Sequence, residues 1–263
     1  MCLNGWGGKL HDRLLPYLKS NTPDVLCLQE VVHSPQTNKD WLTYRDGDHI
    51  LPQRANFFRD VSLALPDHLA LFCPAAQGVL WDDEVQVPSQ WGLATFVRRT
   101  YPMTEQVQGF VHKTYSPFGY GSHPRSRNAH GIKLFDYKGN RSVAILHMHG
   151  LRDLKGKMDT PERIIQAQNL VSLTNVLTRE RDPLIVCGDF NVEPDSETFA
   201  ILAEAGLKDL VTTQTTRGTR TSYYKKSNKH ADYMLVNEYV KVKQFEVVYS
   251  PEVSDHCPLV LEV

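Results

Sequence analysis

The sequence predicts an α/β protein whose strands form one mixed sheet or two sheets. A hairpin pattern over residues 131–150, with a turn around Lys138-Gly139-Asn140, requires two antiparallel strands. The clearest helical pattern, over residues 159–182, then leads into the apolar strand Leu184–Cys187, as in a helical crossover. Because hairpins and crossovers occur together, the pattern argues against an all-parallel barrel.

The first half of the chain has clear elements at its two ends and a weak pattern between them. Residues 2–6 are typical of the end of a strand, so the chain is expected to begin inside one, and further residues could precede Met1 in a longer precursor. A helix is predicted after residue 10, although Pro16 argues against a long one. The remaining expectations are a turn at Pro23, a buried strand over 25–30, loops over 34–89 with short helical pieces at 41–44 and 61–65, and a strand over 92–99.

The second half of the chain has a more regular pattern. Thr160 is a suitable N-cap for the helix over 159–182, Pro161 suits its first turn, and apolar residues follow at helical spacing. A short helix is predicted over 196–205, and strands are predicted over 231–236, 242–249 and 258–263. No linker interrupts this pattern, so a single domain is expected over residues 1–263.

The composition is ordinary for a globular protein, with 41% hydrophobic and 22% charged residues. A formal net charge of −1 argues against a protein that coats nucleic acid through a uniformly basic surface. No apolar run approaches the roughly 20 residues that span a bilayer, and the N-terminus lacks the features of a signal peptide. The five cysteines are scattered and form no CxxC pair. They are expected to be buried free thiols in a reducing, cytoplasmic environment.

Polar side chains occur where several predicted strands end. Glu30 ends the apolar run LCLQE, and Asp189 and Asn191 follow the run LIVC two positions apart. Alternate residues of a strand share a face, so Asp189 and Asn191 are expected to point toward a common target. Any one of these residues alone is more often a cap or a surface ion pair than a catalytic group. The other members of the set are Asn4, His147, His149, Asp232, Asp255 and His256.

Taken together, these residues suit a hard divalent cation. Carboxylates and amides without thiolates favour Mg²⁺ or Mn²⁺, which also bind substrate phosphate. The same groups could activate water, hold phosphoryl oxygens and protonate a leaving group during attack on a phosphoester. A zinc site at His147 and His149 is the weaker alternative, because no third soft ligand is evident nearby.

Six short motifs carry the polar residues: LNGW, LCLQEV, LHMHG, CGDFN, HADYMLV and SDHCPL. In this order and at about this spacing they resemble the endonuclease/exonuclease/phosphatase superfamily, which includes pancreatic-type deoxyribonuclease, apurinic endonucleases, neutral sphingomyelinases and inositol polyphosphate 5-phosphatases. Each motif alone is weak, because a stretch so short can occur by chance. The six motifs in this order are specific, and they cover nearly the whole chain. The resemblance implies a four-layer α/β sandwich, in which helices flank two packed mixed β-sheets and the site lies at one edge.

The resemblance also implies roles for five of the residues. Glu30 resembles the principal metal ligand, and Asn4 resembles an asparagine that supports metal or phosphate. Asp189 resembles the carboxylate that orients or deprotonates the attacking water, and Asn191 its phosphate-binding companion. Asp255 is implied as a further metal ligand, directly or through water.

For the histidines and one arginine, the resemblance implies contacts as well as roles. Asp232 is implied to orient His256 and to favour its charged form, so these two side chains are predicted to touch. His256 would then bind phosphoryl oxygens or protonate the leaving group. One of His147 and His149 should match the family's strand histidine; the pattern favours His149 as catalytic and leaves His147 as a substrate contact. Arg127 resembles a phosphate-binding arginine of the deoxyribonuclease branch, although a surface arginine beside a strand explains it equally well.

The implied function is hydrolysis of a phosphoester with Mg²⁺ or Mn²⁺, and a phosphodiester is the favoured substrate. For a nuclease, the stretch TTRGTRTSYYKKSNKH offers basic and aromatic side chains for a nucleic-acid backbone and its bases, although a solvated loop also explains it. The alternative is a small-molecule or lipid-headgroup phosphatase or phosphodiesterase, and a remote alternative is a non-catalytic scaffold. The expected partner is therefore a phosphoester, with nucleic acid as one candidate, and no obligate protein partner is indicated.

Overall fold

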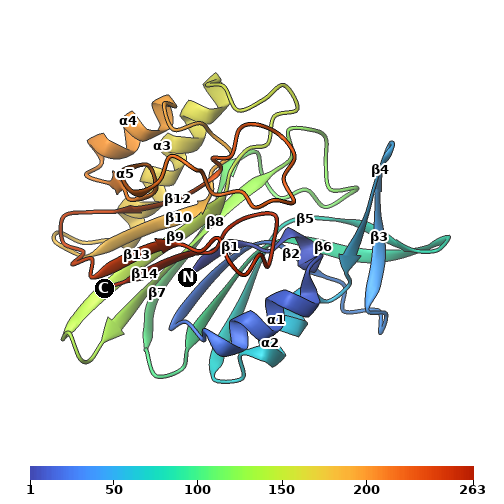
Figure 1. The fold of residues 1–263 in the computed structure, drawn as a ribbon, viewed down its shortest axis with the longest axis horizontal. Helices are drawn as coiled ribbons and strands as arrows, with labels where there is room; N and C mark the ends of the chain where they lie inside the picture. Colours follow the sequence, from blue (N-terminus) through green and yellow to red (C-terminus); the bar gives the residue numbers. More distant parts are fainter.

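Two β-sheets lie face to face in the computed structural model, which describes residues 1–263 (Figure 1). Helices α1 (His11–Ser20) and α2 (Phe57–Ala64) lie on the outer side of one sheet. Helices α3 (Pro161–Leu177) and α4 (Glu197–Glu204) lie on the outer side of the other. This order of helix, sheet, sheet and helix confirms the expected four-layer α/β sandwich.

Both sheets are mixed, because the parallel pairs β1–β2 and β9–β10 lie among antiparallel neighbours. The eight-stranded sheet has the order β13 (Gln244–Val247), β14 (Leu259–Glu262), β1 (Cys2–Asn4), β2 (Val25–His33), β6 (Val85–Arg98), β5 (His68–Asp82), β3 (Trp41–Asp46), β4 (His49–Arg54). The six-stranded sheet has the order β11 (Lys208–Asp209), β12 (Asp232–Val236), β10 (Leu184–Asp189), β9 (Arg141–His149), β8 (Arg127–Asp136), β7 (Met103–His112). The short helices η1 (Trp6–Gly8) and α5 (Val211–Gln214) complete the chain.

The main core contains apolar side chains from both sheets. Leu146 and Val186 of the smaller sheet belong to the same buried cluster as Cys27 and Leu259 of the larger one. Full burial of one such leucine or valine stabilises the fold by about 1.5–3 kcal/mol. The two sheets are therefore held together along their inner faces, and their ends are left to carry polar groups.

Most of the elements expected in the second half are confirmed. Thr160 caps α3 and accepts a hydrogen bond from the backbone N–H of Arg163, with Pro161 as the first helical residue. This helix ends at Leu177, earlier than its sequence pattern predicts. The hairpin of β8 and β9, the helix α4 and the strands β10, β12, β13 and β14 lie where the sequence places them, with small shifts of their ends.

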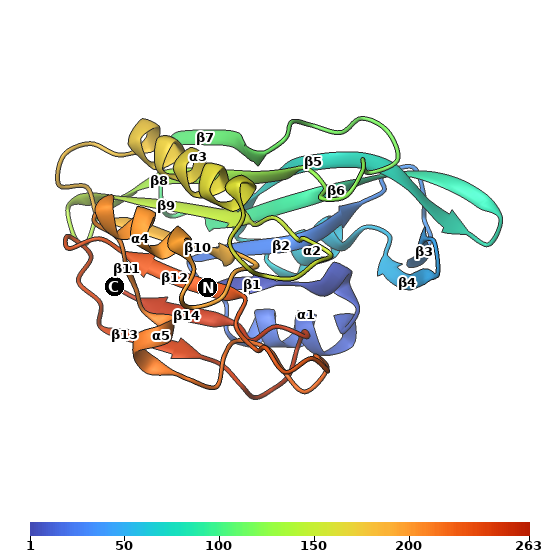
Figure 2. The same cartoon turned by 90° about the horizontal axis from the view of Figure 1, so that it is seen from above.

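The expectation of an irregular region over residues 34–89 is wrong, although the helical piece expected at 61–65 overlaps α2. This region contains β3, β4, α2 and β5, and residues 41–44 are in a strand rather than a helical turn. Prolines obscure the strands, and two of them are tolerated for a local reason: Pro52 lies in the edge strand β4, and Pro74 lies at a register shift of β5. Figure 2 shows that the long β5–β6 hairpin projects from the body of the molecule. Strand β7 was also not expected.

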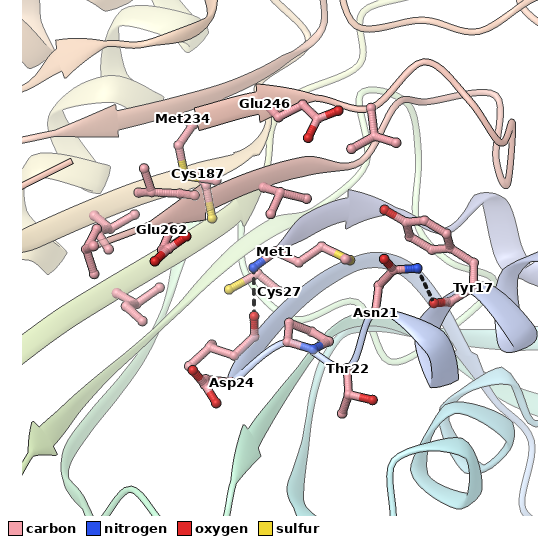
Figure 3. Close-up of a pocket in the computed structure, with 18 of the residues that line it drawn as sticks. Met1, Tyr17, Asn21, Thr22, Asp24, Cys27, Cys187, Met234, Glu246 and Glu262 are labelled. Carbon is pink, nitrogen blue, oxygen red and sulfur yellow. Dashed lines mark hydrogen bonds between the residues drawn. The ribbon is translucent and has the colours of Figure 1, made fainter. Parts of the chain in front are cut away.

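A cavity of about 1140 Å³ lies between the sheets near the start of β2 and the end of β14 (Figure 3). Met1, Tyr17, Cys27 and Cys187 are among its lining residues, and none of the predicted site residues lines it.

All five cysteines are free and buried, as expected. None of the helices is long and apolar enough to cross a membrane.

Candidate active site

Glu30 lies at a β-bulge inside β2 and not, as the sequence suggests, at the end of the strand. The pairing with β6 shifts between Leu28 and Val31, so that Gln29 and Glu30 together oppose a single residue. A bulge of this kind turns a side chain out of the regular alternation. The backbone φ of Glu30 is 56°, in the left-handed region that residues other than glycine rarely adopt. Its side chain remains 27% exposed, so the bulge presents a carboxylate at the edge of the sandwich.

Asp189 is the central acidic group of the site and is 1% exposed. Its Oδ2 atom accepts a hydrogen bond of 3.0 Å from the amide Nδ2 of Asn4, and its Oδ1 accepts one of 3.0 Å from the backbone N–H of Asn191. The Nε2 atoms of His149 and His256 lie 3.7 and 3.6 Å from Oδ2. Four of the predicted residues therefore surround this one carboxylate.

Asn191 reaches the site for a different reason from the one expected. Strand β10 ends at Asp189, and Asn191 has a left-handed φ of 55°, so the two residues do not share a strand face. The side-chain amide of Asn191 donates to the backbone oxygen of Gly150, 3.3 Å away. Just before the turn, Gly188 has a φ of 143°, and a Cβ there would lie 2.1 Å from the backbone oxygen of Met148. A glycine is therefore required where β9 and β10 approach each other.

The predicted contact between Asp232 and His256 is present. The Nδ1 atom of His256 lies 2.8 Å from each carboxylate oxygen of Asp232. Thr219 donates from its hydroxyl to Oδ2 of Asp232 at 2.8 Å and accepts from the backbone N–H of the same residue. Because all three residues are buried, the orientation of the imidazole is fixed by Asp232 and that of Asp232 by Thr219.

Burial and neighbouring charges act on the pKa values of both members of this pair. Burial lowers the pKa of His256 below its ordinary value, and Arg220 lowers it further. Burial also raises the pKa of Asp232, to about 6, although Arg220 and the Thr219 hydrogen bond oppose this rise. The carboxylates of Asp189 and Asp255, 3.6 and 3.7 Å from Nε2 of His256, instead raise the pKa of this imidazole, and Nε2 faces the site.

The structure brings His149 to the site and leaves His147 in the interior. His149 pairs with Asp189 across β9 and β10, and its Nε2 lies 4.0 Å from Oε1 of Glu30. Its Nδ1 is buried without a partner. In contrast, both ring nitrogens of His147 are bonded between the sheets, Nδ1 to Gln29 at 3.1 Å and Nε2 to Thr95 at 2.8 Å. His147 therefore does not join the other residues as a substrate contact.

Arg127 is a buried residue at the rim of the site and not a surface arginine. It is 5% exposed, and its guanidinium lies 4.9 Å from the ring centroid of Trp91. Nε donates to the backbone oxygen of Gly150 at 2.8 Å. Burial lowers the pKa of Arg127 to about 10, while the charges of Glu30 and Asp189 raise it. Arg127 is therefore charged at neutral pH and acts electrostatically on both carboxylates.

Two cations in the site were not expected from the sequence in this role. Arg220 lies between two acidic residues, with Nη1 2.8 Å from Oδ2 of Asp255 and Nη2 3.9 Å from Oδ2 of Asp189. Lys157 donates to the backbone oxygen of His230, and burial lowers its pKa against the opposing charge of Asp189. Both residues lie in loops. A loop has no regular residue spacing, so the sequence pattern could not predict that they lie in the site.

The donor set fits a hard divalent cation at Glu30. Burial raises the pKa of Glu30, and the charge of Asp189 adds to this rise. Burial likewise raises the pKa of Asp255, to which the charge of Glu30 contributes, and Oδ1 of Asp255 is buried without a hydrogen-bond partner. A cation would relieve this repulsion and supply the missing partner. Glu30 would hold the ion together with Asn4 and Asp255, and all ligands would be oxygen atoms, as Mg²⁺ and Mn²⁺ prefer.

Comparison with known proteins agrees with the fold and with this arrangement of motifs. The model of the Endonuclease/Exonuclease/phosphatase family matches residues 2–256. The chain therefore belongs to the Endonuclease/Exonuclease/phosphatase family, as its motifs suggest. A search of the curated proteins finds no match.

Several solved structures share the fold at low sequence identity. The mannosyl-6-phosphatase Bt3783 of Bacteroides thetaiotaomicron is 16% identical with a TM-score of 0.67, and the match covers 98% of this chain and 91% of that one. The catalytic domain of human Nocturnin is 20% identical with a TM-score of 0.61, over 97% and 87% of the two chains. A humanized TDP2 from D. rerio is 14% identical with a TM-score of 0.62, over 99% and 96%.

Proposed function

We propose that residues 1–263 form one catalytic domain that hydrolyses a phosphoester with the help of Mg²⁺ or Mn²⁺. The observation that carries this proposal is the environment of Asp189. Asn4, Asn191, His149 and His256 surround its carboxylate, and the side chain is 1% exposed. The proposal also agrees with membership of a family that includes nucleases and phosphatases.

The residues of the chain divide the chemistry between them. Asp189 orients the attacking water, because its carboxylate is held from both sides by Asn4 and Asn191. In its protonated form, His256 donates from Nε2 to a phosphoryl oxygen or to the leaving group, since Asp232 occupies Nδ1. A divalent cation at Glu30 would neutralise the negative charge that develops on the phosphoryl oxygens.

A phosphodiester is the favoured substrate, since basic and aromatic side chains border the site. Lys225 and Lys226 are exposed on the loop that also carries Arg220, and the Tyr223 ring lies 6.0 Å from that of Trp6. Basic side chains can neutralise a polyanionic backbone, and aromatic rings can stack on bases. A nuclease is thus the first candidate. The net charge of −1 keeps a smaller phosphoester as the second.

The test is a comparison of substrates with purified protein and saturating Mn²⁺. Single-stranded DNA, RNA, bis(p-nitrophenyl) phosphate and p-nitrophenyl phosphate would be assayed with wild type and with His256→Ala as the background. Faster hydrolysis of the nucleic acids and the diester than of the monoester is expected. Hydrolysis of the monoester alone would instead assign a small-molecule phosphatase. Sphingomyelin and inositol phosphates complete the panel, and no turnover of any of these phosphoesters would contradict an enzymatic function.

A further inference from the structure

Arg220 lies between two acidic residues of the site. Its Nη1 lies 2.8 Å from Oδ2 of Asp255, and its Nη2 lies 3.9 Å from Oδ2 of Asp189. The side chain is 9% exposed, and its Nε is buried without a partner. One guanidinium therefore neutralises two buried carboxylates of the site.

The neighbouring cluster that could bind a cation is already satisfied by protein groups. Ligand atoms of Asp189, Asp232 and His256 all lie within 4.8 Å of one another. However, both oxygens of Asp232 contact Nδ1 of His256, and Oδ2 also accepts from Thr219. Asp189 accepts one hydrogen bond on each oxygen from other residues. A second ion would have to compete with these bonds and with the charge of Arg220.

Arg220 is held in place by its backbone as well as by its side chain. It forms an antiparallel bridge with His256, and the next residue, Thr221, donates its backbone N–H to the backbone oxygen of Asp255 at 3.1 Å. The guanidinium lies 4.5 Å from the ring centroid of Tyr224. Such a side chain is positioned before substrate binds, unlike a flexible surface arginine.

We propose that Arg220 takes the place of a second metal ion, so that the site binds a single divalent cation at Glu30. This inference rests on the proposed function. Enzymes with two metal ions use them to stabilise the attacking and leaving oxygens of the phosphoryl group. Here the guanidinium, whose Nε has no partner, stabilises phosphoryl oxygens beside Asp189, and a cation held at Glu30 would supply the other positive charge. Arginine suits this task because its fork of N–H groups matches phosphate oxygens and its charge does not titrate.

The experiment counts Mn²⁺ ions bound per chain by equilibrium dialysis, with circular dichroism to confirm folding. Wild type is expected to bind one ion. Arg220→Ala should bind a second, because it exposes Asp189 and Asp255 to solvent cations. Arg220→Lys should bind one, since it keeps a charge at this position. Arg54→Ala is a matched control: Arg54 also contacts two carboxylates, Asp60 at 2.8 Å and Asp40 at 3.1 Å, but outside the site, so one ion is expected.

Each other result overturns the inference. Two ions in wild type would show that Arg220 does not replace a metal, whatever the variants do, and would leave the proposed function intact. A single ion in folded Arg220→Ala would show that the guanidinium does not prevent a second ion from binding. A second ion in Arg54→Ala would show that any exposed carboxylate pair binds Mn²⁺. No ion in wild type would contradict both this inference and the proposed function.

Discussion

The Nδ1 atom of His256 lies 2.8 Å from both carboxylate oxygens of Asp232, a residue 24 positions earlier in the chain. The two residues come from separate segments, the start of β12 and the loop before β14. An imidazole held in this way has one tautomer and one orientation, which a positioned catalytic group requires. This pair is the most direct target for mutation.

His256→Ala and Asp232→Asn are each expected to lower kcat by roughly 10² or more, the usual scale for positioned acid–base groups. The double variant should lose little more than His256→Ala alone, because the two residues act as a unit. Steady-state kinetics of the three variants would measure this. Losses that multiply fully in the double variant would show that the residues act independently.

Asp189→Asn is also expected to lower kcat by roughly 10² or more while the protein remains folded. The amide keeps the volume of the side chain but removes the charge that orients water. Asp24→Asn is the matched control, because Asp24 pairs with Arg98 at 2.7 Å near the opposite strand ends and should keep normal kcat. A wild-type rate in folded Asp189→Asn would remove Asp189 from the catalytic assignment.

Turnover is expected to require a divalent hard cation. EDTA should abolish hydrolysis, and added Mg²⁺ or Mn²⁺ should restore it. The carboxylate of Glu30 and the amide oxygen of Asn4 are ligands that suit these ions. Differential scanning fluorimetry supplies an independent measurement: Mn²⁺ should raise the Tm of wild type and raise that of Glu30→Gln less. Full activity after exhaustive chelation would rule out metal dependence.

Stability is expected to fall between about pH 6.5 and pH 4 because of histidines buried between the sheets. Burial lowers the pKa of His130 to about 4, and His130 shares the hydroxyl of Thr95 with His147. In this window the unfolded chain binds a proton that the native state does not, so stability decreases as the pH falls. At 1.36 kcal/mol for each pKa unit, His130 alone accounts for about 3 kcal/mol.

His130→Gln is the variant that tests this assignment, because it can still accept a hydrogen bond but cannot titrate. Its Tm should fall less between pH 7 and pH 5 than that of wild type. An equal fall in both proteins would place the acid sensitivity in other groups.

The parts of the site that local sequence could predict are those where polar residues directly precede or follow an apolar run. Asp189, Asp232 and His256 lie at such places, and the structure brings them together. The bulge at Glu30 depends on how β2 pairs with β6, which is more than 50 residues away in the chain, so the local pattern suggested a strand end instead. Asn191 was expected from strand alternation, but it reaches the site through a left-handed turn.

The strands over residues 34–89 could not be recognised because their burial is not regular. Strand β3 and the edge strand β4 are partly exposed on both faces, so polar and apolar residues do not alternate cleanly. Arg220 and Lys157 were not predicted as site residues because both lie in loops. A loop has no repeating pattern of side chains from which the orientation of one side chain could be inferred. Their positions follow only from contacts with distant segments.

The bulge that turns Glu30 toward the site is expected to support the proposed activity and to lower thermal stability. A left-handed backbone at a glutamate costs about 1–3 kcal/mol. Burial and the charge of Asp189 also disfavour the ionised form of Glu30, and so raise its pKa. Asparagine tolerates this backbone and carries no charge. Glu30→Asn is therefore expected to melt at a higher temperature than wild type while losing turnover; a lower Tm would show that Glu30 stabilises the fold. An enzyme optimised for heat resistance alone would not keep a glutamate at this position.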